Sequence, residues 1–261
     1  MYLRFSTELL INLSMKYFRL INCFLIVVFL SCQGTQSLTA EEVIDQSVES
    51  YGFHQNGYQI NFDFRDYQYA LKRKNNFYSY SRQRMQKQQL VRDIMSSEAK
   101  LKRYVNDSLV VLNDSIRHLY TNSLNSVLYF FQLPRPLKDP AVNFTDLGKV
   151  QIAGASYWVI KVTFDQEGGG DDFQDEYRYW INQNTYLIDY LAYNYLTDGG
   201  GTRFRKAVNR RRIDGFLIQD YENYKPVEKF PPLDQLPLLF QEGKLNLVSH
   251  IESKNIQVKP L

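Results

Sequence analysis

Cysteine is scarce in this chain of 261 residues, and the two that occur, Cys23 and Cys32, both lie near the amino terminus. Residues 33–261 can therefore form no disulfide, and they offer no thiol nucleophile and no cysteine ligand for a metal. Histidine is almost as rare, and His54, His118 and His250 lack the spacing typical of metal sites. A chain of this length can bury a core large enough to be stable without disulfides.

The sequence also lacks the motifs that mark common enzyme sites, namely G-x-S-x-G, the P-loop and G-x-G-x-x-G. Lys161 lies in an apolar segment, and a buried lysine can lose its proton and form Schiff bases. Alternation, however, places Lys161 in phase with Val159 and Thr163 on the outward side of a strand. We therefore expect no enzymatic activity, no cofactor and no metal.

The chain also lacks a large net charge. The formal net charge of the whole chain is +3, and Arg4, Lys16, Arg19 and Glu8 contribute +2 of it within residues 1–32. The remaining +1 is not the charge balance of a nucleic-acid-binding domain.

No apolar run is long enough to span a bilayer comfortably, which takes about 20 residues. The longest candidate, Leu20–Leu30, is interrupted by Asn22 and follows Lys16 and Arg19. A basic segment, a short apolar core and then a small residue before a cleavage site are typical of a secretory signal. Met15 begins a better-formed leader than Met1, so translation from Met15 is an alternative start.

The residues Phe29, Leu30, Ser31 and Cys32 resemble the lipobox of a bacterial lipoprotein. The resemblance implies that residues 1–32 are a signal peptide and that Cys32 becomes the acylated first residue of the mature protein. Two or more acyl chains anchor a protein stably to a membrane. An ordinary cleaved signal peptide and an uncleaved membrane helix remain alternatives. Gln33 is not the aspartate linked with inner-membrane retention, which favours the outer membrane.

Helical periodicity occurs twice after the leader. Thr39 and Glu42 form a capping box that predicts a helix over residues 38–53, with Gly52 at its end. Asp114 is the expected cap of a second helix over residues 115–131.

The rest of residues 54–258 alternates between apolar and polar residues, which predicts antiparallel strands. Ile60, Phe62 and Phe64 share one side of the first strand, and Asp214–Gly215 is a strong hairpin turn. A proline-rich crossing over residues 230–237 precedes one final strand, predicted over residues 245–258. We expect one domain, residues 33–261.

Three segments carry a resemblance to a known family: YWVIKVTF (157–164), YRYWINQNTYLID (177–189) and RRRIDGFLIQDYENY (210–224). Together with the lipobox and the order of elements, they resemble an uncharacterised Bacteroidetes lipoprotein family similar to the LolA/LolB/LppX group of lipoprotein and lipid carriers. The resemblance implies a mostly β (α+β) fold, a curved antiparallel half-barrel sheet with an N-terminal helix and a helical insertion. It also implies that acyl chains lie between the sheet and the helices.

Large side chains on the inner face of such a sheet can line an apolar concavity. The candidates for ligand contact are Phe62, Phe64, Tyr78, Tyr80, Trp158, Ile160, Tyr179 and Ile181. The alternative is that the same side chains fill a solid core.

Two charged segments leave alternatives open. Asp165, Glu167, Gly169, Gly170, Asp171 and Glu176 match an EF-hand-like spacing, but their flanks predict strands, so a solvated hairpin loop is the better interpretation. The basic residues between Arg203 and Arg212 form either a surface for anionic headgroups or a solvated strand face paired with Asp and Glu.

The sequence thus predicts a monomeric lipoprotein that is anchored to the membrane through acylated Cys32, faces the periplasm and binds a lipid or the acyl chains of a lipoprotein. The alternatives are an anchored module that binds proteins or envelope polymers without an internal ligand, and an enzyme with an unrecognised site. We expect no nucleic acid among its partners.

Overall fold

The computed structural model describes residues 38–167, 173–196 and 199–261. The predicted signal peptide and Cys32 lie outside these residues, as do three of the residues with the EF-hand-like spacing, Gly169, Gly170 and Asp171. Thr39–Leu261 forms a compact unit. Within the described ranges, no helix has both the length and the apolar character needed to cross a membrane.

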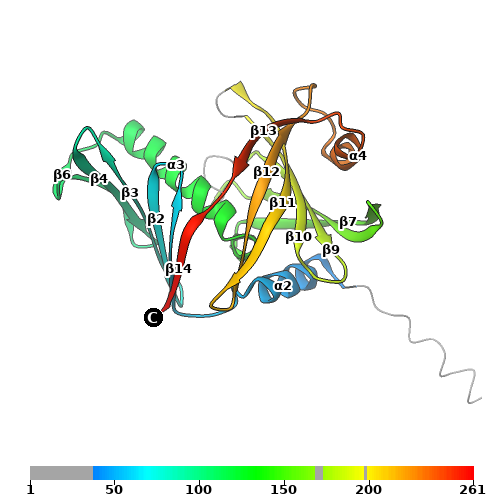
Figure 1. Ribbon diagram of the computed structural model, residues 1–261, viewed down its shortest axis with the longest axis horizontal. Helices are drawn as coiled ribbons and strands as arrows, with labels where there is room; N and C mark the ends of the chain where they lie inside the picture. The colour runs from blue at the N-terminus through cyan, green and yellow to red at the C-terminus, as the bar shows by residue number, and fades with distance from the viewer. Residues whose placement is uncertain (1–37, 168–172, 197–198) are drawn as a thin grey trace, which may run out of the picture. The chain divides into compact units, whose positions relative to one another are not determined.

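Two curved antiparallel sheets of seven strands each make up most of this unit (Figure 1). The first sheet has the strand order β14-β1-β2-β3-β4-β5-β6, and the second has the order β13-β12-β11-β10-β9-β8-β7. The first sheet consists of β1 (Tyr58–Phe64), β2 (Tyr67–Lys74), β3 (Phe77–Gln86), β4 (Gln89–Ser96), β5 (Ala99–Val105), β6 (Ser108–Val110) and β14 (Lys254–Pro260). The second consists of β7 (Val142–Ile152), β8 (Ala155–Phe164), β9 (Glu176–Asn182), β10 (Ile188–Tyr195), β11 (Gly201–Ile213), β12 (Phe216–Lys225) and β13 (Asn246–Ile251). The predicted fold class is confirmed.

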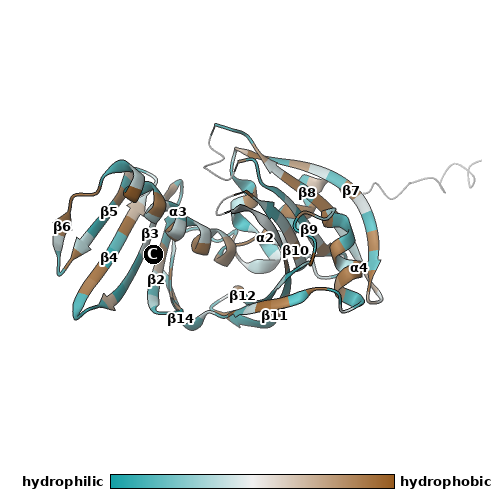
Figure 2. Cartoon of the chain, turned by 90° about the horizontal axis from the view of Figure 1, so that it is seen from above, coloured by the Kyte–Doolittle hydropathy of each residue, from teal (hydrophilic) through white to brown (hydrophobic). Residues whose placement is uncertain are grey.

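Short turns connect most neighbouring strands, as the alternating sequence predicts. Asp214 and Gly215 both have positive φ angles, 47° and 89°, and form the predicted turn between β11 and β12. Figure 2 shows apolar and polar residues alternating along strands such as β4 and β7. This alternation lets one face of a strand pack inward while the other meets water.

The carboxyl-terminal segment corrects the sequence prediction of one final strand. It forms two strands, and β13 pairs with β12 in the second sheet whereas β14 pairs with β1 in the first. The chain therefore passes from one sheet to the other at Glu252 and Ser253. A side-chain pattern of period two continues through such a crossing, so the sequence alone does not reveal it.

A set of polar contacts fixes this crossing. The two terminal nitrogens of Arg211 donate to the carboxylate of Asp220 at 3.0 and 3.2 Å, and one of them also donates to the carbonyl oxygen of Ser253. The amide of Ser253 donates to Asp220 Oδ1 at 3.0 Å. We call Arg211, Asp220 and Ser253 the crossover clasp, because it joins β11 and β12 to the start of β14.

Helix α2 (Ala40–Tyr51) begins with the predicted capping box, in which the amide of Glu42 donates to the Thr39 hydroxyl and the Thr39 amide donates to the Glu42 carboxylate. Gly52 ends the helix in the left-handed region. The buried face of the helix carries Val43, Ile44, Val48 and Tyr51 and packs against β12 and β7.

Helix α3 (Asp114–Phe131) is the predicted helical insertion, but its cap is Asn113 rather than Asp114. The Asn113 side chain accepts from the amide of Ile116 at 2.9 Å. The first half of α3 packs against the first sheet, where Arg117 donates to the carbonyl oxygen of Leu101. The second half reaches the second sheet, so this helix contacts both (Figure 1).

The predicted proline-rich crossing forms two short helices, η3 (Leu233–Gln235) and α4 (Leu236–Gln241), which the sequence prediction missed. They cover the outer face of the second sheet and complete an apolar core with Trp180, Tyr190 and Phe204. A further short helix, η1 (Arg135–Lys138), follows α3.

Candidate ligand-binding cleft

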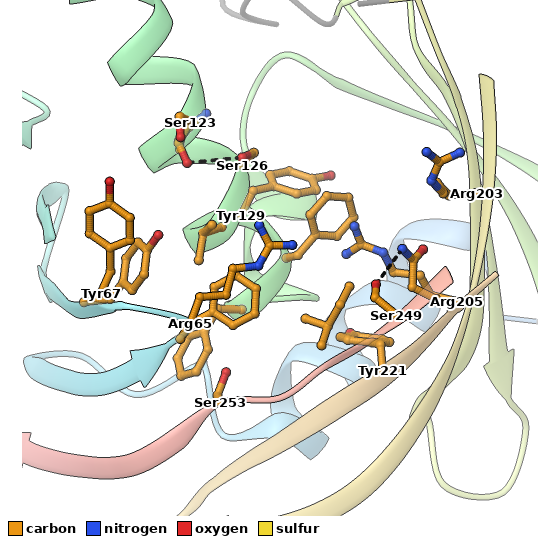
Figure 3. A pocket seen from close by; sticks show the side chains of 18 of the residues that line it. Arg65, Tyr67, Ser123, Ser126, Tyr129, Arg203, Arg205, Tyr221, Ser249 and Ser253 are labelled. Atoms are coloured by element: carbon orange, nitrogen blue, oxygen red, sulfur yellow. Dashed lines mark hydrogen bonds between the residues drawn. The ribbon is translucent and has the colours of Figure 1, made fainter. Parts of the chain in front are cut away.

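A cavity of about 910 Å³ lies between the two sheets beside the second half of α3, and we call it the intersheet cleft. Its walls come from β1, β2 and β3 of the first sheet, from α3, and from β8 to β13 of the second sheet. Figure 3 shows Tyr67 on the side of the first sheet, Tyr129 on α3, and Arg203 and Arg205 on β11. The cleft has the volume of a typical small-ligand site.

Aromatic rings from the first sheet and α3 form one wall. Phe62 stacks on Phe131 with ring centroids 3.8 Å apart and planes 2° apart. Its other neighbour is Tyr69, at 5.3 Å and 11°. The strand positions 62 and 64 share one face, as predicted, and Phe64 lines the cleft too. This stack holds the first sheet against the end of α3.

Rings from the second sheet form the opposite wall. Tyr177 stacks on Tyr193 at 5.2 Å, and Phe130 of α3 lies 5.4 Å from Tyr193. The hydroxyls of Tyr129 and Tyr179 lie 3.3 Å apart, and burial raises the pKa of both above the ordinary value. Both tyrosines are therefore uncharged at neutral pH.

Among the described residues, the cleft walls carry more cations than anions. The arginines are Arg65, Arg82, Arg84, Arg203 and Arg205, and the acidic residues are Asp66 and Asp175. Arg84 pairs with Asp66 at 2.6 Å. Arg82 pairs with the buried Asp93 at 2.9 Å, and its Nη1 donates to the Ser123 hydroxyl at 2.8 Å. These two arginines therefore have partners within the protein.

Arg205 differs from these two. Its side chain is buried, with 8% of the residue exposed, and Nη2 donates to the Tyr193 hydroxyl at 2.8 Å. The guanidinium carbon lies 3.7 Å from the ring centroid of Phe130. Among the described residues, no carboxylate forms an ion pair with Arg205, and its buried Nε has no hydrogen-bond partner.

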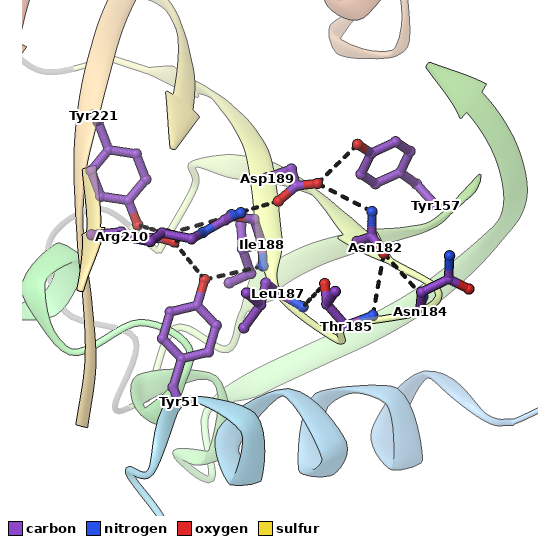
Figure 4. Close-up of polar contacts among 11 residues, drawn as sticks. Tyr51, Tyr157, Asn182, Asn184, Thr185, Leu187, Ile188, Asp189, Arg210 and Tyr221 are labelled. Atoms are coloured by element: carbon purple, nitrogen blue, oxygen red, sulfur yellow. Dashed lines mark hydrogen bonds and ion pairs between the residues drawn. The ribbon is translucent and has the colours of Figure 1, made fainter. Parts of the chain in front are cut away.

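A polar network connects α2 to the second sheet (Figure 4). The Tyr51 hydroxyl donates to Gln219 Oε1 at 2.8 Å and accepts from the amide of Ile188 at 3.1 Å. Arg210 binds Asp189 at 2.5 Å, and Asp189 also accepts from the Tyr157 hydroxyl at 2.9 Å. Because donors and acceptors are matched, the network gives a physical account of how α2 is held on the sheet.

Of the eight predicted contact residues, Phe62 and Phe64 line the intersheet cleft. The other six are not among its lining residues. They are Tyr78, Tyr80, Trp158, Ile160, Tyr179 and Ile181. Whether any of the eight contacts a ligand stays a prediction.

The six lie in well-packed surroundings. The Tyr80 hydroxyl accepts from Gln132 and from Arg73, and the Tyr80 ring contacts that of Tyr78. Trp158 stacks on Tyr186 at 5.1 Å. Ile160, Tyr179 and Ile181 are fully buried on adjacent strands β8 and β9.

The sequence left two interpretations of the basic segment of β11, a surface for anionic headgroups or a strand face paired with Asp and Glu. Different residues of the segment fit each one. Arg210, Arg211 and Lys206 pair with Asp189, Asp220 and Glu222. Arg203 and Arg205 instead face the cleft. The sequence identified this basic segment but did not predict that Arg203 and Arg205 face a cleft, because the carboxylates that pair with Arg210 and Arg211 come from other strands. The only available signal was the spacing of two between Arg203 and Arg205 on one strand.

Lys161, considered above as a candidate nucleophile, forms an ion pair with Glu176 at 2.5 Å and is about a third exposed. This agrees with the outward position that alternation predicted. The same Glu176 pairs with Arg178 at 2.9 Å. Among the described residues, no group of three or more His, Cys, Asp or Glu side chains is placed to hold a metal ion.

Two curved antiparallel sheets with an aromatic cleft beside a helix define the structural class of this chain. A LolA superfamily protein from Nitrosomonas europaea has a similar fold, with a TM-score of 0.50 and 13% identity over 86% of this chain and 96% of that one. A family model described as "Family of unknown function (DUF6503)" matches residues 16–253, so the chain belongs to this family.

Two other solved structures are more distantly similar. A DUF1329 family protein from Desulfovibrio piger has a TM-score of 0.42 and 11% identity over 85% of this chain and 93% of that one. The Mycobacterium tuberculosis lipoprotein LppX has a TM-score of 0.27 and 11% identity over 62% of this chain and 91% of that one. No curated protein matches the sequence significantly.

Proposed function

We propose that this chain is a lipid-anchored carrier that binds a lipid, or the acyl chains of a lipoprotein, in the intersheet cleft. The observation that carries the proposal is the cleft itself, about 910 Å³ of space walled by stacked aromatic rings. Aromatic side chains provide large apolar contact areas at low conformational cost. The similarity to a LolA superfamily protein is consistent with this use of the fold.

The proposal includes the sequence predictions on location. Cys32 carries the acyl anchor, residues 33–261 form the single mature domain, and the protein is a monomer that faces the periplasm from the outer membrane. A Bacteroidetes origin belongs to the same proposal. Binding needs no chemical step, because transfer follows from a difference in affinity between the cleft and the membrane. The protein therefore acts without enzymatic turnover.

Lipid extraction tests this function. The full chain is expressed, extracted from membranes with mild detergent and analysed by mass spectrometry for lipids that copurify. We expect one lipid species close to one per protein, distinct from the bulk lipid. Random membrane lipid in proportion to its abundance would contradict the proposal.

Two tryptophan variants on α3 provide the comparison. Ser126 is exposed and lines the cleft, whereas Ser115 is exposed at the start of the same helix and does not line it. Ser126→Trp fills the cleft and is expected to reduce the bound lipid at least severalfold. Ser115→Trp should retain it. Equal lipid content in both variants would place the bound lipid outside the cleft.

A further inference from the structure

Arg205 is an unusual cation because it is removed from water and none of the described residues provides a negative partner for it. Its side chain is more than nine-tenths buried, and a guanidinium has five N–H donors. The only hydrogen bond from the Arg205 side chain to another described residue goes to the hydroxyl of Tyr193. A buried charge of this kind is costly unless something of opposite charge joins it.

The other two fully buried arginines among the described residues, Arg82 and Arg178, show what the fold provides elsewhere. Arg82 and Arg103 share Asp93, Arg178 pairs with Glu176 and Asp234, and Arg211 pairs with Asp220. Each of these pairs is 2.7 to 3.0 Å long. Among the described residues, Arg205 is thus the one fully buried arginine without such a pair. The half-buried Arg73, which donates to the Tyr80 hydroxyl at 3.1 Å, also lacks one, but it retains more contact with water.

A second arginine lies beside it. Arg203 is two positions away on β11, so both side chains lie on the cleft face of the strand. Phe204 between them points to the opposite face and is fully buried in the apolar core. Arg203 lies 4.9 Å from the ring of Tyr195 and donates to the carbonyl oxygen of Thr202. Among the described residues it too has no ion pair with a carboxylate.

The aromatic neighbours fix the guanidinium of Arg205 in place. Phe130 lies 3.7 Å away and Tyr193 lies 5.3 Å away, measured from the guanidinium carbon to the ring centroids. Cation–π contacts of this kind stabilise the cation but leave its N–H groups without acceptors. The N–H groups of the Arg205 guanidinium thus lie between the aromatic wall and the open cleft (Figure 3).

We propose that the ligand of the cleft is an anionic amphiphile, and that Arg205, with Arg203 beside it, binds its carboxylate or phosphate while the aromatic walls hold its acyl chain. This inference rests on the proposed function and adds the charge of the ligand. Arginine matches both anions because its planar fork donates two parallel hydrogen bonds. The anion supplies the acceptors that the described residues do not.

Competition with a neutral probe tests the inference. The full chain is purified in nanodiscs of zwitterionic phosphatidylcholine and loaded with the uncharged fluorophore N-phenyl-1-naphthylamine. The competitors are oleic acid, oleyl alcohol, oleoyl lysophosphatidylglycerol and oleoyl lysophosphatidylcholine, all with the same chain. We expect the anionic member of at least one pair to displace the probe about tenfold to a hundredfold better, the range for charge-assisted hydrogen bonds. The preferred pair identifies the anion as carboxylate or phosphate.

The variants separate charge from structure. Arg205→Gln is expected to lose the preference for the anion while still binding the probe, and Arg205→Lys should keep part of it. Arg203→Gln, at a less buried position, should lose a smaller part, and it remains informative if Arg205→Gln does not fold. Arg212→Gln is the control, because Arg212 is exposed on the same strand and donates to the carbonyl oxygen of Ser50 outside the cleft.

The outcomes distinguish the two proposals. Equal displacement by charged and neutral competitors would overturn the anion inference and leave the carrier function intact. A preference that survives in both Arg205→Gln and Arg203→Gln would also overturn it. Failure of the wild-type protein to bind the probe or any competitor would instead contradict the carrier function itself.

Discussion

Glu176 shows how one carboxylate at the start of β9 serves two cations. Lys161 of β8 lies 2.5 Å from it and Arg178 lies 2.9 Å from it. Burial acts to raise the pKa of Glu176, but the hydrogen bond from Lys161 and the charge of Arg178 outweigh it, and the pKa falls below its ordinary 4.5. A carboxyl whose pKa is lowered in the folded state contributes stability above its unfolded pKa and loses it as pH falls through the folded pKa.

We therefore expect Glu176→Gln to lower the free energy of unfolding at pH 7 by less than about 1 kcal/mol, since the pair is partly exposed and screened. The difference from the wild type should shrink as pH falls below 4.5. Urea unfolding at several pH values measures both. Glu98→Gln, at an exposed turn between β4 and β5, is the control and should show little change. A difference that grows in acid would refute this account.

Helix α2 meets the hairpin of β11 and β12 at a point where two glycines approach each other. Gly52 has φ = 80° at the end of the helix, and a Cβ built on it would lie 2.3 Å from the carbonyl oxygen of Gly215. A contact this short with backbone cannot be relieved by turning a side chain. The sequence predicted Gly52 as a helix stop, and the close approach to Gly215 adds a second reason for glycine there.

Gly52→Ala is expected to destabilise the protein by clearly more than the roughly 1 kcal/mol that a left-handed alanine costs. Gly154→Ala is a matched control. Gly154 has φ = 82°, and its added Cβ would meet nothing within 4 Å. Thermal or urea unfolding of the two variants gives the difference, which reports the contact between α2 and the hairpin. Equal losses in the two variants would mean that the backbone relaxes around the new methyl group.

Taken as a whole, the described unit depends on how its two sheets are joined. β14 completes the first sheet beside β1, with Tyr58 opposite Pro260 and Ile60 opposite Val258. The crossover clasp of Arg211, Asp220 and Ser253 holds the point where the chain leaves the second sheet. The walls of the intersheet cleft include residues from both sheets, so the clasp also bears on the cleft.

Asp220→Asn removes the charge that Arg211 binds, and we expect a loss of about 1 to 3 kcal/mol because Asp220 is buried. Hydrogen exchange should quicken in β13 and β14 more than in β3 and β4, since the former two flank the clasp. Asp107→Asn is the control, because its pair with Arg92 at 2.9 Å is exposed. Uniform acceleration across both sheets would show that the clasp has no local role.

Local chemistry in the sequence specified much of this protein. The capping box of α2, the turn at Asp214–Gly215 and the shared face of Phe62 and Phe64 all depend on residues close together in the chain. Helix and strand periods follow from such neighbours, so the elements and the β-rich fold class are predictable. The observed cap of α3, Asn113, lies one residue before the predicted cap, Asp114.

Long-range pairing accounts for the rest. The predicted last strand divides between two sheets because its first half, β13, pairs with β12 and its second half, β14, pairs with β1. A side-chain period of two predicts a strand but does not identify the strand that it pairs with. Likewise, six arginines and lysines along β11 look alike in sequence, yet Arg210 and Arg211 meet carboxylates of other strands while Arg205 meets none among the described residues. Ion pairing depends on distance in space, so the cation of the cleft became visible only once the strands were assembled.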